Sequence, residues 1–258
     1  IKSSIDYASF IQAAMLKKKP YLNEFTDDSF IFFQPKDVVG GDFYWYTQVD
    51  NKLIIAAADC TGHGVPGAFL TVLGYNFLNQ IVNNSQETDP GRILEELHVN
   101  VRDALNQQVS DNKDGMDIAL CTIDKEKGKL QFAGANNPLV YIENGKIALI
   151  NGEKYGIGGF TDKLFKRQKD KNNKKVMFET HSLDLKESMQ LYMFSDGYVD
   201  QNGGDESTEM KSQDFYDLIL KNAKKSFKVQ KDKLVNHYND WKAENEQVDD
   251  VLVIGLKV

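Results

Sequence analysis

The stretch Ala58-Asp59-Cys60-Thr61-Gly62-His63-Gly64-Val65-Pro66-Gly67-Ala68 decides the fold expected for this chain. It follows the apolar run 53–57, which is typical of a buried strand. The carboxylate of Asp59 therefore lies where a strand runs into a glycine-rich turn, and Pro66 suits the first turn of a helix. Apolar side chains then recur every four residues and predict a buried helix face made of Phe69, Leu73, Phe77 and Ile81.

Composition narrows the class of protein. The chain has 258 residues, of which 41% are hydrophobic, and this is enough for one domain with a sizeable core. A net charge of −7, without basic runs interleaved with aromatic residues, argues against a nucleic-acid-binding protein. No apolar run approaches the roughly 18 residues of a membrane span, so we expect no membrane contact by this fragment.

The two cysteines, Cys60 and Cys121, form no C-x-x-C pair. Neither a disulfide framework nor a thiolate zinc site is therefore indicated, and a reducing cytoplasm fits best. The chain begins with Ile1 in place of Met, so we expect a piece of a longer protein, and that full-length protein could be tethered to a membrane.

Residues 2–19 lack Gly and Pro and predict a helix that ends before Pro20. Its apolar residues fall on one narrow stripe: Ile5, Ala8, Ile11, Met15 and Leu16. Two interpretations stay open, because the stripe could pack on the domain or could form a linker or dimerising helix that follows an upstream sensor. We therefore divide the chain into a linker or regulatory helix, residues 1–20, and a main domain, residues 21–258.

A second acid, Asp42, follows Gly40-Gly41 and precedes an aromatic run of high strand propensity. Asp50-Asn51 predicts a hairpin turn between strands 42–49 and 52–59. Antiparallel pairing of these strands would place Asp42 and Asp59 at the same end of the hairpin. Two converging carboxylates repel each other unless a cation lies between them.

Further elements follow from periodicity and turn signals. Asp89-Pro90-Gly91 opens a second helix, and apolar runs predict strands over 118–123, 130–133, 139–142 and 189–194. Helical spacing returns around 215–219 and 234–241, before a last strand near the C-terminus. Residues 161–175 carry seven Lys or Arg and form either a solvated excursion or a flap that faces the substrate.

Four acids lie at strand ends far apart in the sequence: Asp42, Asp59, Asp196 and Asp249. Single Asp residues at such places are often turn formers, but clustered buried carboxylates need a cation. A shared metal site is the economical explanation. Oxygen ligands suit magnesium, manganese or calcium better than zinc.

Four motifs, in this order, resemble those of the metal-dependent (PPM, type 2C-like) serine/threonine protein phosphatases. They are Val38-Val39-Gly40-Gly41-Asp42-Phe43-Tyr44-Trp45, the stretch 58–68, Phe194-Ser195-Asp196-Gly197-Tyr198 and Asp249-Asp250. The chain is most similar to the bacterial branch of stage II sporulation protein E and RsbU-type regulatory phosphatases. The likeness covers roughly residues 21–258, and the preceding helix resembles the linker found upstream of such domains.

The resemblance implies an α+β fold, a four-layer α-β-β-α sandwich of two antiparallel sheets with flanking helices. It also implies two Mn²⁺ or Mg²⁺ ions at one edge of the sandwich. Carried over by motif, Asp42 and Asp59 would be the catalytic acids shared by the metals, with Asp59 bridging. Asp196 and Asp249 would bind one ion, and the backbone carbonyl of Cys60 would be a further ligand.

Other roles are carried over by weaker likeness. Asp114 or Asp117 would approach a third ion. No arginine of this chain matches the one with which the type 2C relatives bind phosphate; Lys36, the cation nearest the Asp42 motif, is the candidate for that role, and an ordinary surface lysine is the alternative. His63 follows Asp59 by four residues and is a second candidate for substrate binding.

The implied activity is hydrolysis of phosphoserine or phosphothreonine on a regulatory protein, such as an anti-sigma-factor antagonist, by a hydroxide held by two metal ions. The implied partners are the phosphoprotein, an upstream sensor and a second copy bound through the N-terminal helix. A catalytically silent module of the same fold is the alternative, although it would not need four acids. Hydrolysis of a small phosphoester or nucleotide lacks any P-loop or dinucleotide motif in the sequence.

Overall fold

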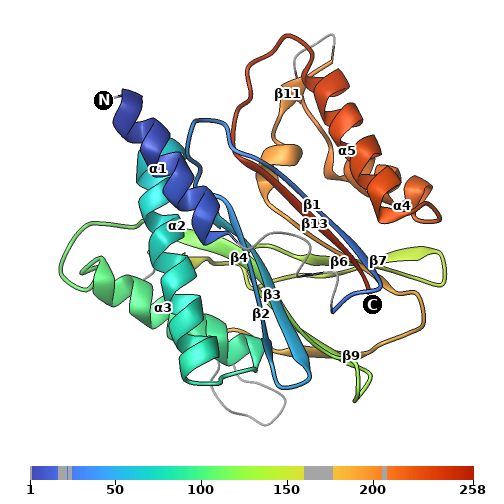
Figure 1. Ribbon diagram of the computed structural model, residues 1–258, viewed down its shortest axis with the longest axis horizontal. Coiled ribbons are helices and arrows are strands. Elements are labelled where there is room, and N and C mark those ends of the chain that lie inside the picture. The colour runs from blue at the N-terminus through green and yellow to red at the C-terminus, as the bar shows by residue number, and fades with distance from the viewer. Residues whose placement is uncertain (1, 17–21, 23–24, 160–176, 205–207) are drawn as a thin grey trace.

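The computed structural model describes residues 2–16, 22, 25–159, 177–204 and 208–258. Two antiparallel sheets pack face to face between two layers of helices (Figure 1). This is the predicted four-layer α-β-β-α sandwich. The basic stretch 161–175 lies outside the described residues.

The sheet called here the β3 sheet has the order β2-β3-β4-β5-β9, with β8 paired to β4. Its strands are β2 (Phe43–Val49), β3 (Lys52–Cys60), β4 (Gly115–Asp124), β5 (Lys129–Ala135), β8 (Ile157–Gly158) and β9 (His181–Asp184). The other sheet, called the β13 sheet, has the order β1-β13-β10-β6-β7. Its strands are β1 (Asp28–Gln34), β6 (Leu139–Glu143), β7 (Lys146–Ile150), β10 (Gln190–Phe194) and β13 (Val251–Lys257).

The helices are α1 (Lys2–Met15), α2 (Gly64–Leu78), which continues as a π-helix (Asn79–Asn84), α3 (Pro90–Ala104), α4 (Ser212–Asn222) and α5 (Phe227–Lys242). A short hairpin joins β11 (Asn202–Gly203) to β12 (Thr208–Glu209), and a 3₁₀ turn covers Asp196–Tyr198. Among the described residues, none of these helices is long and apolar enough to cross a bilayer.

Three apolar clusters hold the layers together. Side chains such as Ile55 and Ile254 fill the space between the sheets. Leu70 of α2 and Leu94 of α3 cover the outer face of the β3 sheet. α4 and α5 cover the outer face of the β13 sheet, where Phe215 joins a third cluster. Each layer therefore buries one face against the next, which is how such sandwiches gain stability.

The β2–β3 hairpin has the predicted register. Val49 pairs with Lys52 across the two-residue turn, and Phe43 pairs with Ala58 at the far end. Asp50 adopts a φ of 50°, as an Asp-Asn hairpin turn requires. The residues just beyond this last pair, Asp42 and Asp59, therefore lie at the same end of the hairpin, as predicted.

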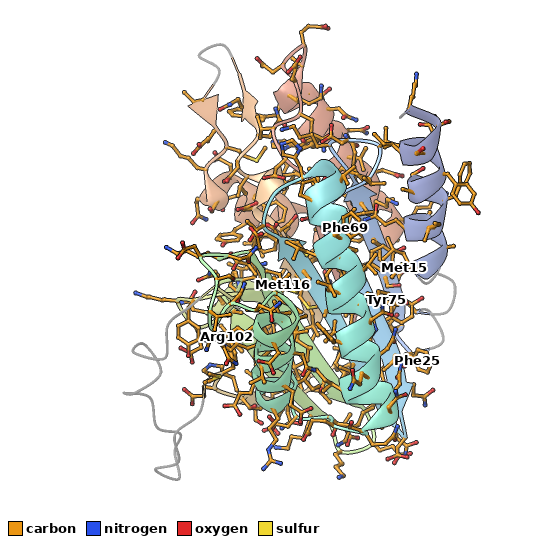
Figure 2. The ribbon with its side chains drawn as sticks, turned by 90° about the vertical axis from the view of Figure 1, so that its left-hand side faces the viewer. Met15, Phe25, Phe69, Tyr75, Arg102 and Met116 are labelled. Atoms are coloured by element: carbon orange, nitrogen blue, oxygen red, sulfur yellow. The ribbon has the colours of Figure 1, made fainter. Side chains whose placement is uncertain are left out.

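The prediction for the buried face of α2 and its continuation is confirmed for Ile81, which is 1% exposed, and for Leu73 and Phe77, which pack partly buried against the core, but it is wrong for Phe69. Phe69 is 70% exposed, and the residues buried instead are Gly67, Leu70, Thr71, Gly74, Tyr75 and Leu78. Glycines explain this, because a Cβ at Gly74 would lie 2.9 Å from the ring of Phe43. The face of α2 that carries the glycines therefore lies closest to the sheet. The spacing of large apolar residues does not identify that face, because glycine is not one of them. Figure 2 shows Phe69 and Tyr75 on this helix.

α1 forms within the predicted range and lies beside α2 (Figures 1 and 2), although residues 17–19 are outside the described part. The predicted apolar stripe does not face one way. Leu16 is buried and Ile5 is half-buried, whereas Ile11 is 51% exposed. The side chain buried within α1 is Gln12, a polar residue near the C-terminal end of the helix. Two hydrogen bonds to the backbone of Gly40 hold Gln12 toward the domain. The face of α1 that packs on the domain therefore differs from the face that apolar periodicity predicts.

Candidate metal centre

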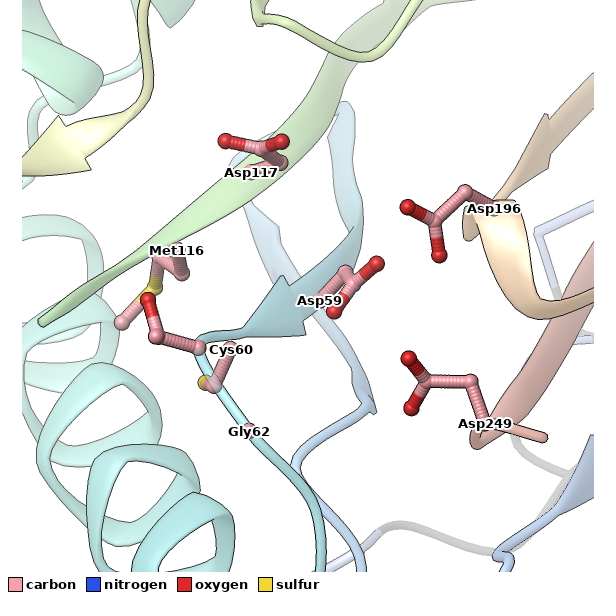
Figure 3. A pocket seen from close by; sticks show the side chains of 8 residues that line it. Asp59, Cys60, Gly62, Met116, Asp117, Asp196 and Asp249 are labelled. Atoms are coloured by element: carbon pink, nitrogen blue, oxygen red, sulfur yellow. The ribbon is translucent and has the colours of Figure 1, made fainter. Parts of the chain in front are cut away.

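A pocket of about 230 Å³ opens at one edge of the sandwich, where the two sheets meet. Carboxylates dominate its wall, and Figure 3 shows Asp59 facing Asp196 and Asp249, with Asp117 beyond them. The other residues that line it are Cys60, Thr61, Gly62 and Met116.

Strand geometry brings these acids together. Asp59 is the second-last residue of β3 and pairs across the ladder with Asp117 of β4. Asp196 follows β10, and Asp249 precedes β13. Because β10 and β13 are antiparallel, the end of one meets the start of the other, as the pairing of Phe194 with Val253 shows. The β3 sheet therefore contributes Asp59 and Asp117, and the β13 sheet contributes the other two acids.

Asp42 lies behind this wall and is only 1% exposed. Burial raises the pKa of its carboxyl well above the usual value, and a hydrogen bond with Ser195 partly opposes that effect. Its Oδ2 atom has no hydrogen-bond partner among the described residues. A buried carboxylate oxygen without a partner is costly, and a cation could compensate for that cost.

The acids also raise one another's pKa values. The pKa of Asp59 is raised by burial and then by the charges of Asp42 and Asp196. Asp196 and Asp249 line the same pocket as Asp59, so their charges add to those that already raise its pKa. A divalent cation would compensate for this concentration of negative charge.

The donor set fits oxygen-preferring ions such as Mg²⁺ and Mn²⁺, because it contains carboxylates and backbone carbonyls without imidazole. Within the described residues, no three His, Cys, Asp or Glu side chains are arranged so as to enclose a single ion. The acids surround a shared pocket, and the remaining ligands of each ion would be backbone carbonyls and water, which such ions accept.

The structure distinguishes between Asp114 and Asp117, the two candidates for binding a third ion. Asp117 lines the pocket and accepts a hydrogen bond from Asn136 Nδ2 at 2.8 Å. Burial raises the pKa of its carboxyl. Asp114 is not among the lining residues, and its carboxylate accepts from Asn112 Nδ2 at 2.8 Å. Asp117 is therefore the better placed of the two.

Lys36 and His63 meet next to the pocket but do not line it. Lys36 Nζ lies 3.0 Å from His63 Nε2, and His63 Nδ1 lies 2.6 Å from Asp37 Oδ2. An ammonium group can only donate, so Nε2 accepts from Lys36 and the Nδ1–H group donates to Asp37. His63 is also the residue before α2, and its side chain is 45% exposed.

Sequence reasoning gave no separate role to Asp250. The two acids of the Asp249-Asp250 pair, which come just before β13, have different surroundings. Asp249 lines the pocket, whereas Asp250 is 2% exposed and accepts hydrogen bonds from the backbone of Lys36 and Gly41. Both acids precede the strand, so strand periodicity gave no signal for this difference.

Comparison with solved structures finds the same fold in bacterial phosphatase domains. The SiaA-PP2C domain of Pseudomonas aeruginosa is 28% identical with a TM-score of 0.86, and the match covers 100% of this chain and 96% of that one. The PP2C phosphatase domain of SpoIIE from Bacillus subtilis, solved with a fragment of its regulatory domain, is 16% identical with a TM-score of 0.67 and is matched over 90% and 63%. RsbX in complex with magnesium is 17% identical with a TM-score of 0.55 and is matched over 89% and 94%.

The comparison with curated proteins gives no match. The family model of stage II sporulation protein E (SpoIIE) matches residues 49–258, which include Asp59, Asp196 and Asp249. This is most of the chain, and it agrees with the predicted resemblance. The chain belongs to the stage II sporulation protein E family of PP2C-type phosphatases.

Proposed function

We propose that this chain is a protein serine/threonine phosphatase that removes phosphate from phosphoserine or phosphothreonine on a regulatory protein. The observation that carries the proposal is the convergence of Asp59, Asp196 and Asp249 from two sheets on one open pocket. A structural role does not call for three acids around a solvent-filled space, since their mutual repulsion destabilises the fold.

Asp42, Asp59, Asp196 and Asp249 would hold two Mn²⁺ or Mg²⁺ ions, with the carbonyl of Cys60 as a further ligand and Asp117 near a third. The similarity to RsbX, whose structure contains magnesium, supports this assignment. When bound, such ions lower the pKa of water and polarise a phosphoryl group, which is the chemistry that phosphoester hydrolysis needs.

The chain's own side chains would orient the substrate. Lys36 provides a positive charge beside the pocket, and its contact with His63 holds the ammonium group in place. Asp37 in turn holds the imidazole through Nδ1. We propose that this trio of Lys36, His63 and Asp37 binds the phosphate or the peptide next to it, and that an anti-sigma-factor antagonist is the type of substrate protein.

α1 would transmit a signal from an upstream sensor, as residues 1–20 were expected to do. Gln12 Nε2 donates to the carbonyl of Gly40 at 2.7 Å, and Gln12 Oε1 accepts from the Gly40 amide at 3.1 Å. Gly40 lies two residues before Asp42, so a shift of α1 would move the segment that carries a metal ligand. We propose that α1 also pairs with a second copy, and that residues 21–258 form the phosphatase domain.

Both cysteines are free and buried, which agrees with a reducing compartment, and we propose the cytoplasm.

The deciding experiment measures phosphate release from a phosphoserine peptide by the purified chain with Mn²⁺, with Mg²⁺ and with a chelator. We expect activity only with metal, and none from Asp59→Asn, which removes charge but little volume. Circular dichroism should show that this variant is folded. A folded parent that releases no phosphate with either ion would contradict the proposal and favour the catalytically silent module.

A further inference from the structure

The carboxylate of Asp250 binds the backbone of the turn between β1 and β2. Its Oδ1 accepts from the amide of Lys36 at 2.7 Å, and its Oδ2 accepts from the amide of Gly41 at 2.6 Å. Asp250 is 2% exposed, so both bonds are shielded from water. Hydrogen bonds to a charged acceptor in such surroundings are stronger than neutral ones.

Two close contacts pack Asp250 between the segments that carry the acids. A Cβ at Gly40 would lie 2.9 Å from Asp250 Oδ1, so only glycine leaves room for the carboxylate. A Cβ at Gly197 would likewise collide with the carbonyl oxygen of Asp250. Asp250 is therefore in close contact with the residue after Asp196, and it binds the residue before Asp42.

We infer that Asp250 is a positioning residue that fixes the metal-ligating carboxylates relative to one another. This inference rests on the proposed function. Asp250 follows Asp249 directly, and its side chain contacts the segment that carries Asp42. One residue therefore connects candidate ligands from both sheets. It is not itself a ligand, because it does not line the pocket and both of its oxygens already accept amide protons.

The chemistry requires a carboxylate at this position. An asparagine has one acceptor oxygen and one amide nitrogen with two donors. Asp250→Asn would therefore set an NH₂ group against the amide of either Lys36 or Gly41, and that backbone donor would be left unsatisfied. The turn between β1 and β2 would then lose one of these two contacts while all four ligands remain in the chain.

The test is isothermal titration of Mn²⁺ into metal-free Asp250→Asn and parent protein, with phosphopeptide turnover measured across Mn²⁺ concentrations. We expect about 10–100-fold weaker Mn²⁺ binding, the range found when residues that orient metal ligands are removed. Turnover should recover largely at saturating Mn²⁺, whereas that of Asp59→Asn should not.

Asp28→Asn is the matched control. Asp28 also accepts two backbone amides, from Ser29 at 2.9 Å and Phe227 at 3.1 Å, but it pairs with Lys257 at the opposite end of the β13 sheet. We expect this variant to change thermal stability and leave Mn²⁺ affinity as in the parent. A merely structural role for Asp250 would make the two variants behave alike.

If Asp250→Asn does not fold, Gly40→Ala is the deciding variant. Its methyl group displaces the Asp250 carboxylate, although no acidic residue is removed from the sequence. This variant should weaken Mn²⁺ binding in the same way. An active parent that binds Mn²⁺, with a folded variant that binds it equally well, would overturn the inference alone. A parent that neither binds Mn²⁺ nor releases phosphate would overturn the proposed function and the inference with it.

Discussion

At the scale of single residues, the site concentrates negative charge around one pocket, and part of that charge is buried. Asp42 is buried, and Asp59 has its pKa raised first by burial and then by two neighbouring acids. The site therefore destabilises the metal-free fold at neutral pH, as binding sites often do.

The stability of metal-free protein should depend on pH with a defined sign. Asp59 has a folded-state pKa above its ordinary value of 3.8. Such a group contributes stability below that value, and the contribution is lost as pH rises through the folded-state pKa. In chelator at pH 7, the free energy of unfolding of Asp59→Asn should therefore exceed that of the parent by roughly 1–3 kcal/mol, since a shift of one pKa unit corresponds to about 1.4 kcal/mol.

Urea unfolding of both proteins between pH 3.5 and pH 8, in the presence of chelator, measures this difference. We expect it to shrink toward zero at the acid end, where both side chains are neutral. A parent that is more stable than the variant at pH 7 without metal would contradict this prediction. It would show that other groups of the protein already compensate for the repulsion among the carboxylates.

His63→Ala should weaken substrate binding without selecting among leaving groups. Because Nδ1–H donates to Asp37 and Nε2 accepts from Lys36, His63 has no proton directed at the pocket. Exposed contacts of this kind contribute up to about 1 kcal/mol, so we expect KM to rise about two- to fivefold for both a phosphopeptide and para-nitrophenyl phosphate. A much larger loss of kcat with the phosphopeptide alone would identify His63 as a proton donor.

The sequence predicted some of these residues better than others. Asp59, Asp196 and Asp249 each adjoin an apolar run, so strand ends could be located and the acids placed there. The contacts of Asp250 join residues more than 200 positions apart, and local patterns carry no information about them. The choice between Asp114 and Asp117 likewise depended on the register of β3 with β4.

At the scale of elements, α2 and α3 show when periodicity succeeds. α3 begins at Pro90 with the Asp89 side chain accepting from the amide of Arg92, and the apolar residues that recur at helical spacing along it, Ile93, Leu94, Leu97 and Val101, are buried. α2 is apolar on several sides, so its buried face was set by the glycines that allow close approach. The sequence therefore predicted that both helices form. It predicted which face is buried only for α3, the amphipathic helix of the two.

α1 leads to the prediction at this scale. Tyr7, Phe10 and Ile11 are 68%, 72% and 51% exposed and recur at helical spacing on the side opposite Gln12. Replacing Phe10 and Ile11 with Glu should abolish dimerisation in light scattering and weaken apparent Mn²⁺ affinity, because α1 contacts Gly40 through Gln12. Gln12→Ala should weaken Mn²⁺ affinity while the oligomeric state is kept.

Lys2→Glu is the control for charge, since residue 2 is exposed and is not three or four positions from any of these residues, which is the spacing of neighbours on a helix surface. The same oligomeric state in the double variant and the parent would show that α1 is not the dimer contact. Unchanged Mn²⁺ affinity in Gln12→Ala would separate α1 from the metal centre.

At the scale of the molecule, the candidate metal centre lies where the two sheets meet. The layer order was expected from the resemblance, whereas pairings such as β1 with β13 join the two ends of the domain and have no local signature. The candidate ligands come from both sheets, Asp42 and Asp59 beside β2 and β3, and Asp196 and Asp249 beside β10 and β13. Metal bound there would hold the sheets together.

Mn²⁺ should therefore stabilise the whole fold and not only its own loops. At a free concentration of 100 times Kd, a ligand that binds only the folded state adds about 2.7 kcal/mol. For a domain of this size each kcal/mol raises Tm by about 2–4 °C, so we expect a rise of roughly 5–11 °C. Differential scanning calorimetry in chelator and in Mn²⁺, at matched ionic strength, measures it. Asp59→Asn should show little of this rise, and a parent whose Tm does not respond to Mn²⁺ would mean that the acids do not join the sheets through a cation.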